Sequence, residues 1–293
     1  MAAEVWLIGN RGMLGSEVDR LFAGSGVSLV ATDRDCDITD IQALRSVAAA
    51  HRPRWIVNCS AYTAVDKAED ETELAFRINV DGVENIGKVA AENGASVIHI
   101  STDYVFDGTK EGPYTEEDPV NPLGAYGRSK AEGERRLFQA TERSFIIRTA
   151  WLYGIEGKNF AFTMLRLFRE RDSIRVVDDQ WGSPTYAPDL ARVITGIVEG
   201  DSKAYGIYHF TNEGRTSWHE FARAILREAS AAGLADGRCR IDPIPTEQYP
   251  TKARRPKNSF LSKDKIRNQF GIEVRPWEAG LRDYIGELSR KQP

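Results

Sequence analysis

The chain has 293 residues, of which 41% are hydrophobic and 28% charged, and its formal net charge is −4. This length and composition suit a globular protein with one large α/β domain, or with a domain and a smaller lobe. The negative net charge argues against nucleic acid or an acidic membrane surface as a partner. The three cysteines and four histidines are scattered, without the spacing of a disulfide framework or a structural metal site.

The first ten residues, MAAEVWLIGN, contain no basic leader. Their apolar run is too short for a signal peptide or a membrane span. We therefore expect a cytoplasmic protein.

Taken in chain order, short apolar runs alternate with longer segments of helical period. The pattern predicts strands at residues 5–8, 28–32, 55–59, 96–101 and 145–148. It predicts helices at residues 14–23, 41–51, 74–93 and 129–141. Near-continuous apolar strands separated by helices are typical of a parallel sheet covered on both faces. The expected fold class is therefore α/β, with a doubly wound, Rossmann-type sheet.

After about residue 152 the alternation weakens, and loops rich in glycine and proline interrupt it at 182–188 and 243–256. One helix start is clear, because Ser217 and Glu220 have the spacing of a capping box. We predict a dinucleotide-binding domain over residues 1–152 and a smaller, mainly substrate-binding lobe over residues 153–293. Late elements of the first domain are expected to be interleaved with this lobe.

Three glycines follow the first predicted strand directly and lead into the first helix. The first glycine permits a tight turn, the second lets the backbone approach a pyrophosphate, and the third allows helix and strand to pack closely. The amides of the helix N-terminus then face the negative charge. The candidate cofactor-binding residues of this loop are Gly9, Arg11, Gly12, Met13, Leu14 and Gly15.

Asp33 ends the second strand, where a carboxylate ordinarily accepts hydrogen bonds from the adenosine ribose. Alone it would favour NAD(H), because it repels a 2′-phosphate. Arg34 beside it and Arg11 in the glycine loop are placed to neutralise that phosphate. We expect NADP(H) to be preferred and NAD(H) to be usable.

Tyr126 and Lys130 stand four residues apart and therefore on one face of a helix. A phenol with a pKa of ~10 is a poor proton donor or acceptor near neutral pH unless a fixed cation stabilises its anion. Lys130 is such a cation and is also suited to bind the nicotinamide ribose. Thr102, at the end of the fourth strand, can donate a hydrogen bond to a carbonyl oxygen that gains negative charge. These three are the predicted catalytic residues, and Tyr126 and Lys130 are also predicted to contact the cofactor.

These motifs resemble the extended short-chain dehydrogenase/reductase family over nearly the whole chain. The more specific matches are the stretches 58–69, 101–108, 148–154, 180–185 and 255–259. Within the family they are most similar to the branch that reduces the C4 ketone of dTDP-4-dehydro-L-rhamnose with NAD(P)H. The resemblance thus implies a dTDP-linked 4-keto-6-deoxy sugar as the substrate.

The resemblance also implies roles for individual residues. Those implied on the adenosine side of the cofactor are Asp37, Ile38, Ala61, Tyr62 and Thr63. Those implied to contact the sugar are Thr102, Asp103 and Trp151, although core packing is the alternative for Trp151. Arg255, in the basic segment 254–257, fits a clamp for the diphosphate, and a basic surface loop is the alternative.

Other functions stay open. Tyr104 stands where related 4,6-dehydratases have a glutamate, which argues against a dehydratase. Another sugar-nucleotide 4-reductase, a 4-epimerase and an NADP-binding regulatory subunit of the methionine adenosyltransferase type all remain. Some family members bind Mg²⁺ through glutamates at a dimer contact; Glu17 matches one of these positions, but no second glutamate stands at Pro188 or Asp189. Mg²⁺ is therefore doubtful, and both a monomer and a homodimer are compatible with the sequence.

Overall fold

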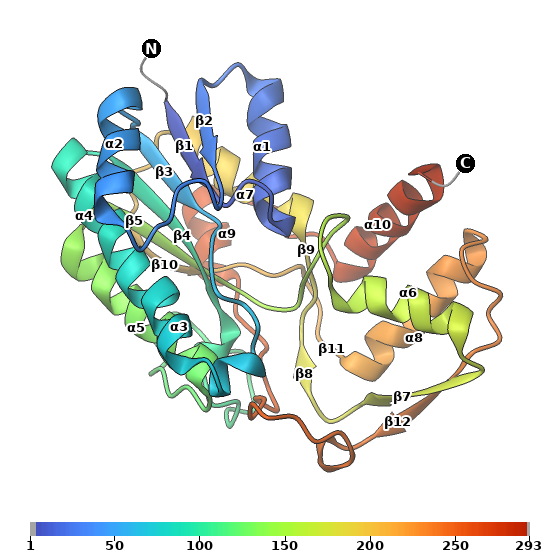
Figure 1. Cartoon of the computed structure of the whole chain (residues 1–293). Coiled ribbons are helices and arrows are strands. Elements are labelled where there is room, and N and C mark those ends of the chain that lie inside the picture. Colours follow the sequence, from blue (N-terminus) through green and yellow to red (C-terminus); the bar gives the residue numbers. More distant parts are fainter. Residues whose placement is uncertain (1–3, 292–293) are drawn as a thin grey trace.

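The structure is a computed structural model that describes residues 4–291. Its centre is a sheet of six parallel strands in the spatial order β2–β1–β3–β4–β5–β10 (Figure 1). The strands are β1 (Val5–Ile8), β2 (Leu29–Thr32), β3 (Trp55–Asn58), β4 (Ser96–Thr102), β5 (Ser144–Thr149) and β10 (Gly206–His209).

Helices cover both faces of this sheet, as the alternation of side chains along each strand requires. In β1, Val5 and Leu7 belong to a core shared with α1 (Met13–Ser25) and α7 (Ala187–Glu199). The intervening residues Trp6 and Ile8 belong to the opposite core. That core includes α2 (Ile41–His51), α4 (Val83–Asn93) and α5 (Ala125–Ala140). The predicted doubly wound parallel sheet is confirmed.

Two predicted helices differ from those observed. The segment predicted as one helix over 74–93 comprises α3 (Thr72–Phe76), a π-helical stretch η2 (Arg77–Gly82) and α4. The helix predicted to start at residue 129 begins at Ala125, so that Tyr126 lies in its first turn. Its first amide is capped by a distant side chain, because Ala125 N donates to Glu69 Oε1 at 2.7 Å. Sequence periodicity cannot predict a helix cap that comes from a residue 56 positions away.

The remaining core belongs to the C-terminal lobe, which lies beside the carboxyl edge of the sheet (Figure 1). It is built from α6 (Phe160–Glu170), α8 (Trp218–Ala231), α10 (Trp277–Lys291) and the parallel pair β7 (Ser173–Val177) and β12 (Arg240–Ile244). The predicted capping box is confirmed at the start of α8 by reciprocal bonds between Ser217 and Glu220. The shorter elements are η1 (Lys67–Glu69), η3 (Asp103–Val105), β6 (Leu152–Tyr153), β8 (Trp181–Gly182), β9 (Thr185–Tyr186), β11 (Thr216–Ser217), η4 (Thr246–Gln248) and α9 (Asp264–Phe270).

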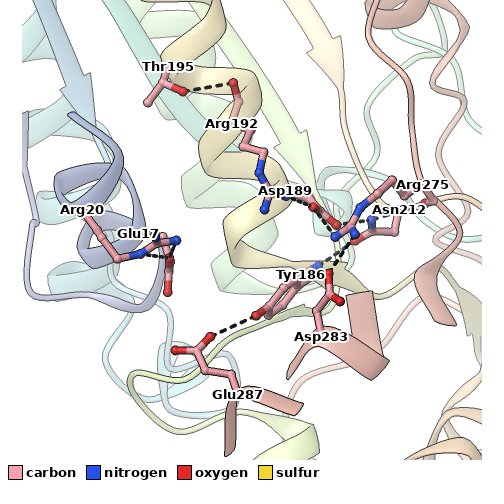
Figure 2. A network of polar contacts seen from close by, with 10 residues as sticks. All are labelled: Glu17, Arg20, Tyr186, Asp189, Arg192, Thr195, Asn212, Arg275, Asp283 and Glu287. Atoms are coloured by element: carbon pink, nitrogen blue, oxygen red, sulfur yellow. Dashed lines mark hydrogen bonds and ion pairs between the residues drawn. The ribbon is translucent and has the colours of Figure 1, made fainter. Parts of the chain in front are cut away.

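A polar network joins the two parts of the molecule (Figure 2). Asp189 on α7 accepts hydrogen bonds from Arg192 at 2.5 Å, Asn212 at 2.7 Å and Arg275 at 2.7 Å. Arg275 also pairs at 2.8 Å with Asp283 on α10. Strand β10 pairs with β5 in the central sheet, and α7 and α9 pack in the core on one face of that sheet. These elements come after residue 152 in the sequence. The predicted domain boundary at residue 152 stays a prediction.

In residues 4–291, no helix is both long enough and apolar enough to cross a lipid bilayer.

Candidate active site

The predicted site residues follow the carboxyl ends of five neighbouring strands. The glycine loop follows β1, Asp33 follows β2, Ala61 follows β3, Thr102 ends β4 and Trp151 follows β5. Parallel strands bring these ends to one edge of the sheet, which is where ligands bind in open α/β folds. The topology therefore gathers residues that are far apart in the sequence.

The glycine loop has no room for side chains at its critical positions. Gly9 has a φ of +83°, a conformation that favours glycine. A Cβ on Gly15 would lie 2.0 Å from the Gly9 carbonyl oxygen. Gly12 is the N-cap of α1 and supplies no capping side chain. The loop thus forms a cradle closed by backbone and offers first-turn amides that no side chain caps, which fits a dinucleotide pyrophosphate.

Asp33 is held by this same loop. Its carboxylate accepts from Arg11 N at 3.2 Å and from Arg34 N at 2.9 Å. The Arg11 and Arg34 side chains are exposed, and neither forms an ion pair among the described residues. The backbone amides of two arginines therefore hold the carboxylate that would meet the adenosine ribose.

The loop after β3 is fixed to the helical layer by Asn79. Tyr62 N donates to Asn79 Oδ1 at 2.9 Å, and Asn79 Nδ2 donates to Tyr62 O at 3.1 Å and to Ser129 Oγ at 3.0 Å. Ala61 and Thr63 are thereby placed on the same edge as the glycine loop. Ile38 is buried against Gly82, and Asp37 is exposed, accepting from Thr39.

Thr102 and Tyr126 meet at the end of β4. Burial raises the pKa of the Tyr126 phenol far above its usual value, and a hydrogen bond with Thr102 opposes this shift. Asp103 and Tyr104 raise it further. The phenol is therefore protonated near neutral pH, and the hydrogen bond with Thr102 opposes the loss of acidity that burial causes.

Lys130, one helical turn after Tyr126, is buried and contacts β4. Its Nζ donates to the Ile100 carbonyl at 2.7 Å and lies 3.1 Å from His99 Nε2. Burial lowers the pKa of Lys130 to about 8, while Glu134 raises it. The sequence predicts that Lys130 lowers the pKa of Tyr126, and this stays a prediction; in the structure a hydrogen bond with Thr102 lowers that pKa.

A buried ion pair fixes α5 against the sheet beside these residues. Arg148 on β5 contacts Glu134 at 2.6 Å, and both side chains are almost fully buried. Ser101 on β4 donates to the same carboxylate at 2.5 Å. Removing one partner of such a pair leaves an uncompensated buried charge, so the pair fixes the position of the helix.

Asp103 is fully buried beside Thr102, which donates to it at 3.0 Å. Burial raises its pKa to about 6, although hydrogen bonds with Ser259 and Thr102 lower it. Its Oδ2 has no hydrogen-bond partner among the described residues. One oxygen thus has an unused bonding position next to the Thr102 hydroxyl, consistent with the predicted contact to the sugar.

Arg255 reaches this region from a loop of the C-terminal half. Its guanidinium pairs with Asp66 at 2.7 Å and donates to the Tyr104 hydroxyl at 3.2 Å. The Tyr104 ring in turn meets the Tyr126 ring edge to face, with centroids 5.6 Å apart. The residue predicted to hold a diphosphate thus has protein partners that the sequence did not suggest.

Trp151 follows β5 with a φ of 49°, which costs a non-glycine residue roughly 1–3 kcal/mol. Thr185 N donates to its carbonyl at 3.2 Å and holds this turn. The indole is stacked on Trp218, with centroids 3.6 Å apart and an interplanar angle of 13°. The stack covers one face of the ring, so that only the other face and the edge are left for the predicted sugar contact.

The acidic residues at the positions compared with Mg²⁺-binding glutamates have protein partners in the structure. Glu17 is nearly buried and pairs with Arg20 at 2.7 Å (Figure 2). Asp189 is taken up by two arginines and an asparagine. Within 4–291 no group of three or more histidine, cysteine or acidic side chains is placed to hold a metal. A cavity of about 450 Å³ lies beside Asp189, and none of the predicted site residues lines it.

Sequence reasoning missed four residues that touch the site. They are Asn58, Asp66, His99 and Trp218. Two of them, Asn58 and Asp66, lie in the stretch 58–69 that resembles the family, and this resemblance could have indicated them as site residues. His99 lies within a strand and Trp218 at a helix start, and only tertiary contacts reveal their neighbours.

A Rossmann-type sheet with a glycine loop after β1, and with a tyrosine and a lysine four residues apart on the helix after β4, defines a short-chain dehydrogenase/reductase. The model of one family, RmlD substrate binding domain, matches residues 3–290. The chain belongs to this family.

Several relatives share nearly the full length of the chain. It is 42% identical over 287 residues to dTDP-4-dehydrorhamnose reductase of Aggregatibacter actinomycetemcomitans, covering 96% of this chain and 98% of the relative. A solved dTDP-4-dehydrorhamnose reductase of Clostridium acetobutylicum superposes with a TM-score of 0.92 at 40% identity, covering 97% and 99%. That of Bacillus anthracis, in complex with NADP, gives 0.91 at 37% identity, covering 98% and 100%.

Proposed function

We propose that the protein reduces the C4 ketone of dTDP-4-dehydro-L-rhamnose to dTDP-L-rhamnose, with NADPH as the preferred reductant. The observation that carries the proposal is the buried Thr102–Tyr126 pair at the end of β4, in a chain of this family. The same site could serve another dTDP-linked 4-keto-6-deoxy sugar, and the product's configuration depends on which sugar face meets the nicotinamide.

Each residue has a distinct part in the proposed reaction. The cofactor supplies a hydride when it is bound by the glycine loop. Thr102 donates a hydrogen bond to the ketone oxygen as negative charge develops there. Tyr126, which is protonated near neutral pH and forms a hydrogen bond with Thr102, delivers the proton to that oxygen. Lys130 binds the nicotinamide ribose. We also propose that residues 1–152 mainly hold the cofactor and residues 153–293 the sugar nucleotide.

The test is NADPH oxidation with dTDP-4-dehydro-L-rhamnose and with the free 4-keto-6-deoxy sugar, followed by identification of the products. We expect the linked sugar to react far faster, because binding energy from the nucleotide helps to position the ketone. Tyr126→Phe should lower turnover by roughly 10²–10⁴-fold and leave NADPH affinity unchanged.

Three outcomes would contradict the proposal. Equal rates with free and linked sugars would make the protein a general carbonyl reductase. Interconversion of sugar isomers without net NADPH oxidation would make it an epimerase. NADPH binding without any turnover would favour a regulatory role.

A further inference from the structure

A chain of buried polar groups lies behind the catalytic lysine. Lys130 Nζ is 3.1 Å from His99 Nε2, and Asn58 Nδ2 is 3.0 Å from His99 Nδ1. Asn58 is in turn bound by Ser60. Apart from Lys130, these residues have no part in the reaction proposed above. Because each member is buried or half-buried, its donors and acceptors must match.

Ser60 fixes the orientation of the Asn58 amide. The Ser60 backbone N–H, which can only donate, lies 3.0 Å from Asn58 Oδ1, and Ser60 Oγ donates to that oxygen at 2.6 Å. The amide NH₂ therefore faces His99. An amide NH₂ has no acceptor role, so it must donate to Nδ1. The proton of the neutral imidazole then lies on Nε2.

The Nε2–H group faces Lys130. An ammonium has three donors and no acceptor, whereas a neutral amine has one lone pair that accepts a hydrogen bond. We infer that Asn58 and Ser60 fix the tautomer of His99, and that His99 thereby favours the neutral amine of Lys130. His99 and Asn58 are positioning residues that act through Lys130. The tautomer of His99 and its effect on Lys130 are inferred from the hydrogen bonds alone. Their importance for catalysis rests on the proposed function.

The other ionisable groups around the pair do not replace this contact. Glu134 raises the pKa of Lys130, but its carboxylate is paired with Arg148 at 2.6 Å. Burial lowers the pKa of His99 well below its usual value, which keeps the ring neutral. Other titratable residues on or next to the same elements are Tyr126 on α5, Asp103 and Tyr104 after β4, and Cys59 after β3. Within residues 4–291 the hydrogen-bond partners of Lys130 Nζ are His99 and the Ile100 carbonyl.

A readily deprotonated lysine suits the proposed reaction, which consumes one proton per ketone. The carbonyl carbon gains the hydride, the oxygen gains the Tyr126 proton, and the C=O double bond becomes a C–O single bond. The tyrosinate must then regain a proton. A neighbouring amine whose pKa is near the working pH can give up a proton and take one from solvent in each cycle.

The tautomer is measured directly by long-range ¹H–¹⁵N correlation on the full chain labelled with ¹⁵N-histidine. His99→Gln assigns the signals, and the other three histidines are internal controls. We expect the proton on Nε2 in the native protein. Asn58→Asp should move it to Nδ1, because a carboxylate oxygen accepts from that nitrogen. Ser60→Ala keeps the backbone N–H and should leave the tautomer unchanged.

The native spectrum tests the inference even if a variant fails to fold. A proton on Nδ1, or on both nitrogens at neutral pH, would overturn it. The second readout is the pKa of Lys130, followed by ¹³Cε-lysine NMR and assigned with Lys130→Met. In Asn58→Asp we expect this pKa to rise by about 1–3 units, the scale of a nearby opposite charge. The alkaline limb of kcat/KM should move to higher pH with it.

These outcomes separate the two proposals. A switched tautomer with an unchanged lysine pKa would refute the coupling between His99 and Lys130. The expected tautomer and pKa in a protein that does not oxidise NADPH with the dTDP-sugar would refute the proposed function and leave the coupling intact.

Discussion

At the scale of single residues, we expect the choice between NADPH and NADH to depend on the residues beside Asp33. Its carboxylate is fixed by the amides of Arg11 and Arg34, and it would repel a 2′-phosphate unless their guanidiniums offset its charge. Replacing both arginines with alanine should weaken NADPH binding by about 10–100-fold, since charged hydrogen bonds of ~1.5–3 kcal/mol are lost. NADH binding should change little. Fluorescence titration with both cofactors measures the effect.

Arg45→Ala is the matched control, because Arg45 pairs with Glu92 between α2 and α4. Equal weakening of NADH and NADPH in the double variant would show that the two arginines do not bind the phosphate.

At the scale of elements, the place of α5 depends on Gly127. A Cβ at this position would lie 2.2 Å from the Tyr104 carbonyl oxygen, a backbone atom that cannot rotate away. Alanine favours a helix by about 1 kcal/mol over glycine, but here the clash must move α5 or the start of η3. We expect Gly127→Ala to lower the free energy of unfolding by about 1–3 kcal/mol, as overpacking does.

Gly286→Ala on α10 is the control, since nothing lies within 4 Å of its added Cβ. This variant should raise the free energy of unfolding by about 0.4–1 kcal/mol. Urea denaturation of both proteins compares them. A Gly127→Ala variant that is as stable as the Gly286→Ala variant would show that the close approach of α5 is unimportant.

At the scale of the whole molecule, Arg255 links the C-terminal half of the chain to the N-terminal half through Asp66. The partly exposed pair with Asp66 is worth only ~0.2–1 kcal/mol in stability. One role for the pair is to position the loop that carries Arg255. Arg255→Ala should raise KM for the dTDP-sugar. If the link is responsible, Asp66→Ala should raise KM similarly, and the double variant should add little.

The alternative is that Arg255 binds the diphosphate itself. Asp66→Ala would then leave KM unchanged or lower it, because the guanidinium would lose a competing anion. Steady-state kinetics of the two single variants and the double variant distinguish the two roles.

The features that could be predicted from the sequence are those formed by residues close to one another along the chain. Five of the six strands of the sheet follow from apolar runs, whereas β10 was not predicted. The glycine loop follows from the spacing of its glycines, and the side-chain position of Gly15 is closed by the backbone of Gly9. The Tyr126/Lys130 pair and the Ser217/Glu220 cap follow from helical spacing. Each of these depends on residues near one another in the chain, so period and spacing predict them.

Contacts between residues that are far apart in the sequence became known from the folded structure. Arg255 pairs with Asp66 across 189 positions, Glu69 caps α5 across 56, and His99 faces Lys130 across 31. No periodic pattern encodes such contacts, because they depend on how strands order themselves and how the two halves pack. The burial of Lys130, Tyr126 and Asp103 likewise depends on how distant segments pack. Because burial is the largest cause of their pKa shifts, these shifts could not be predicted from the sequence.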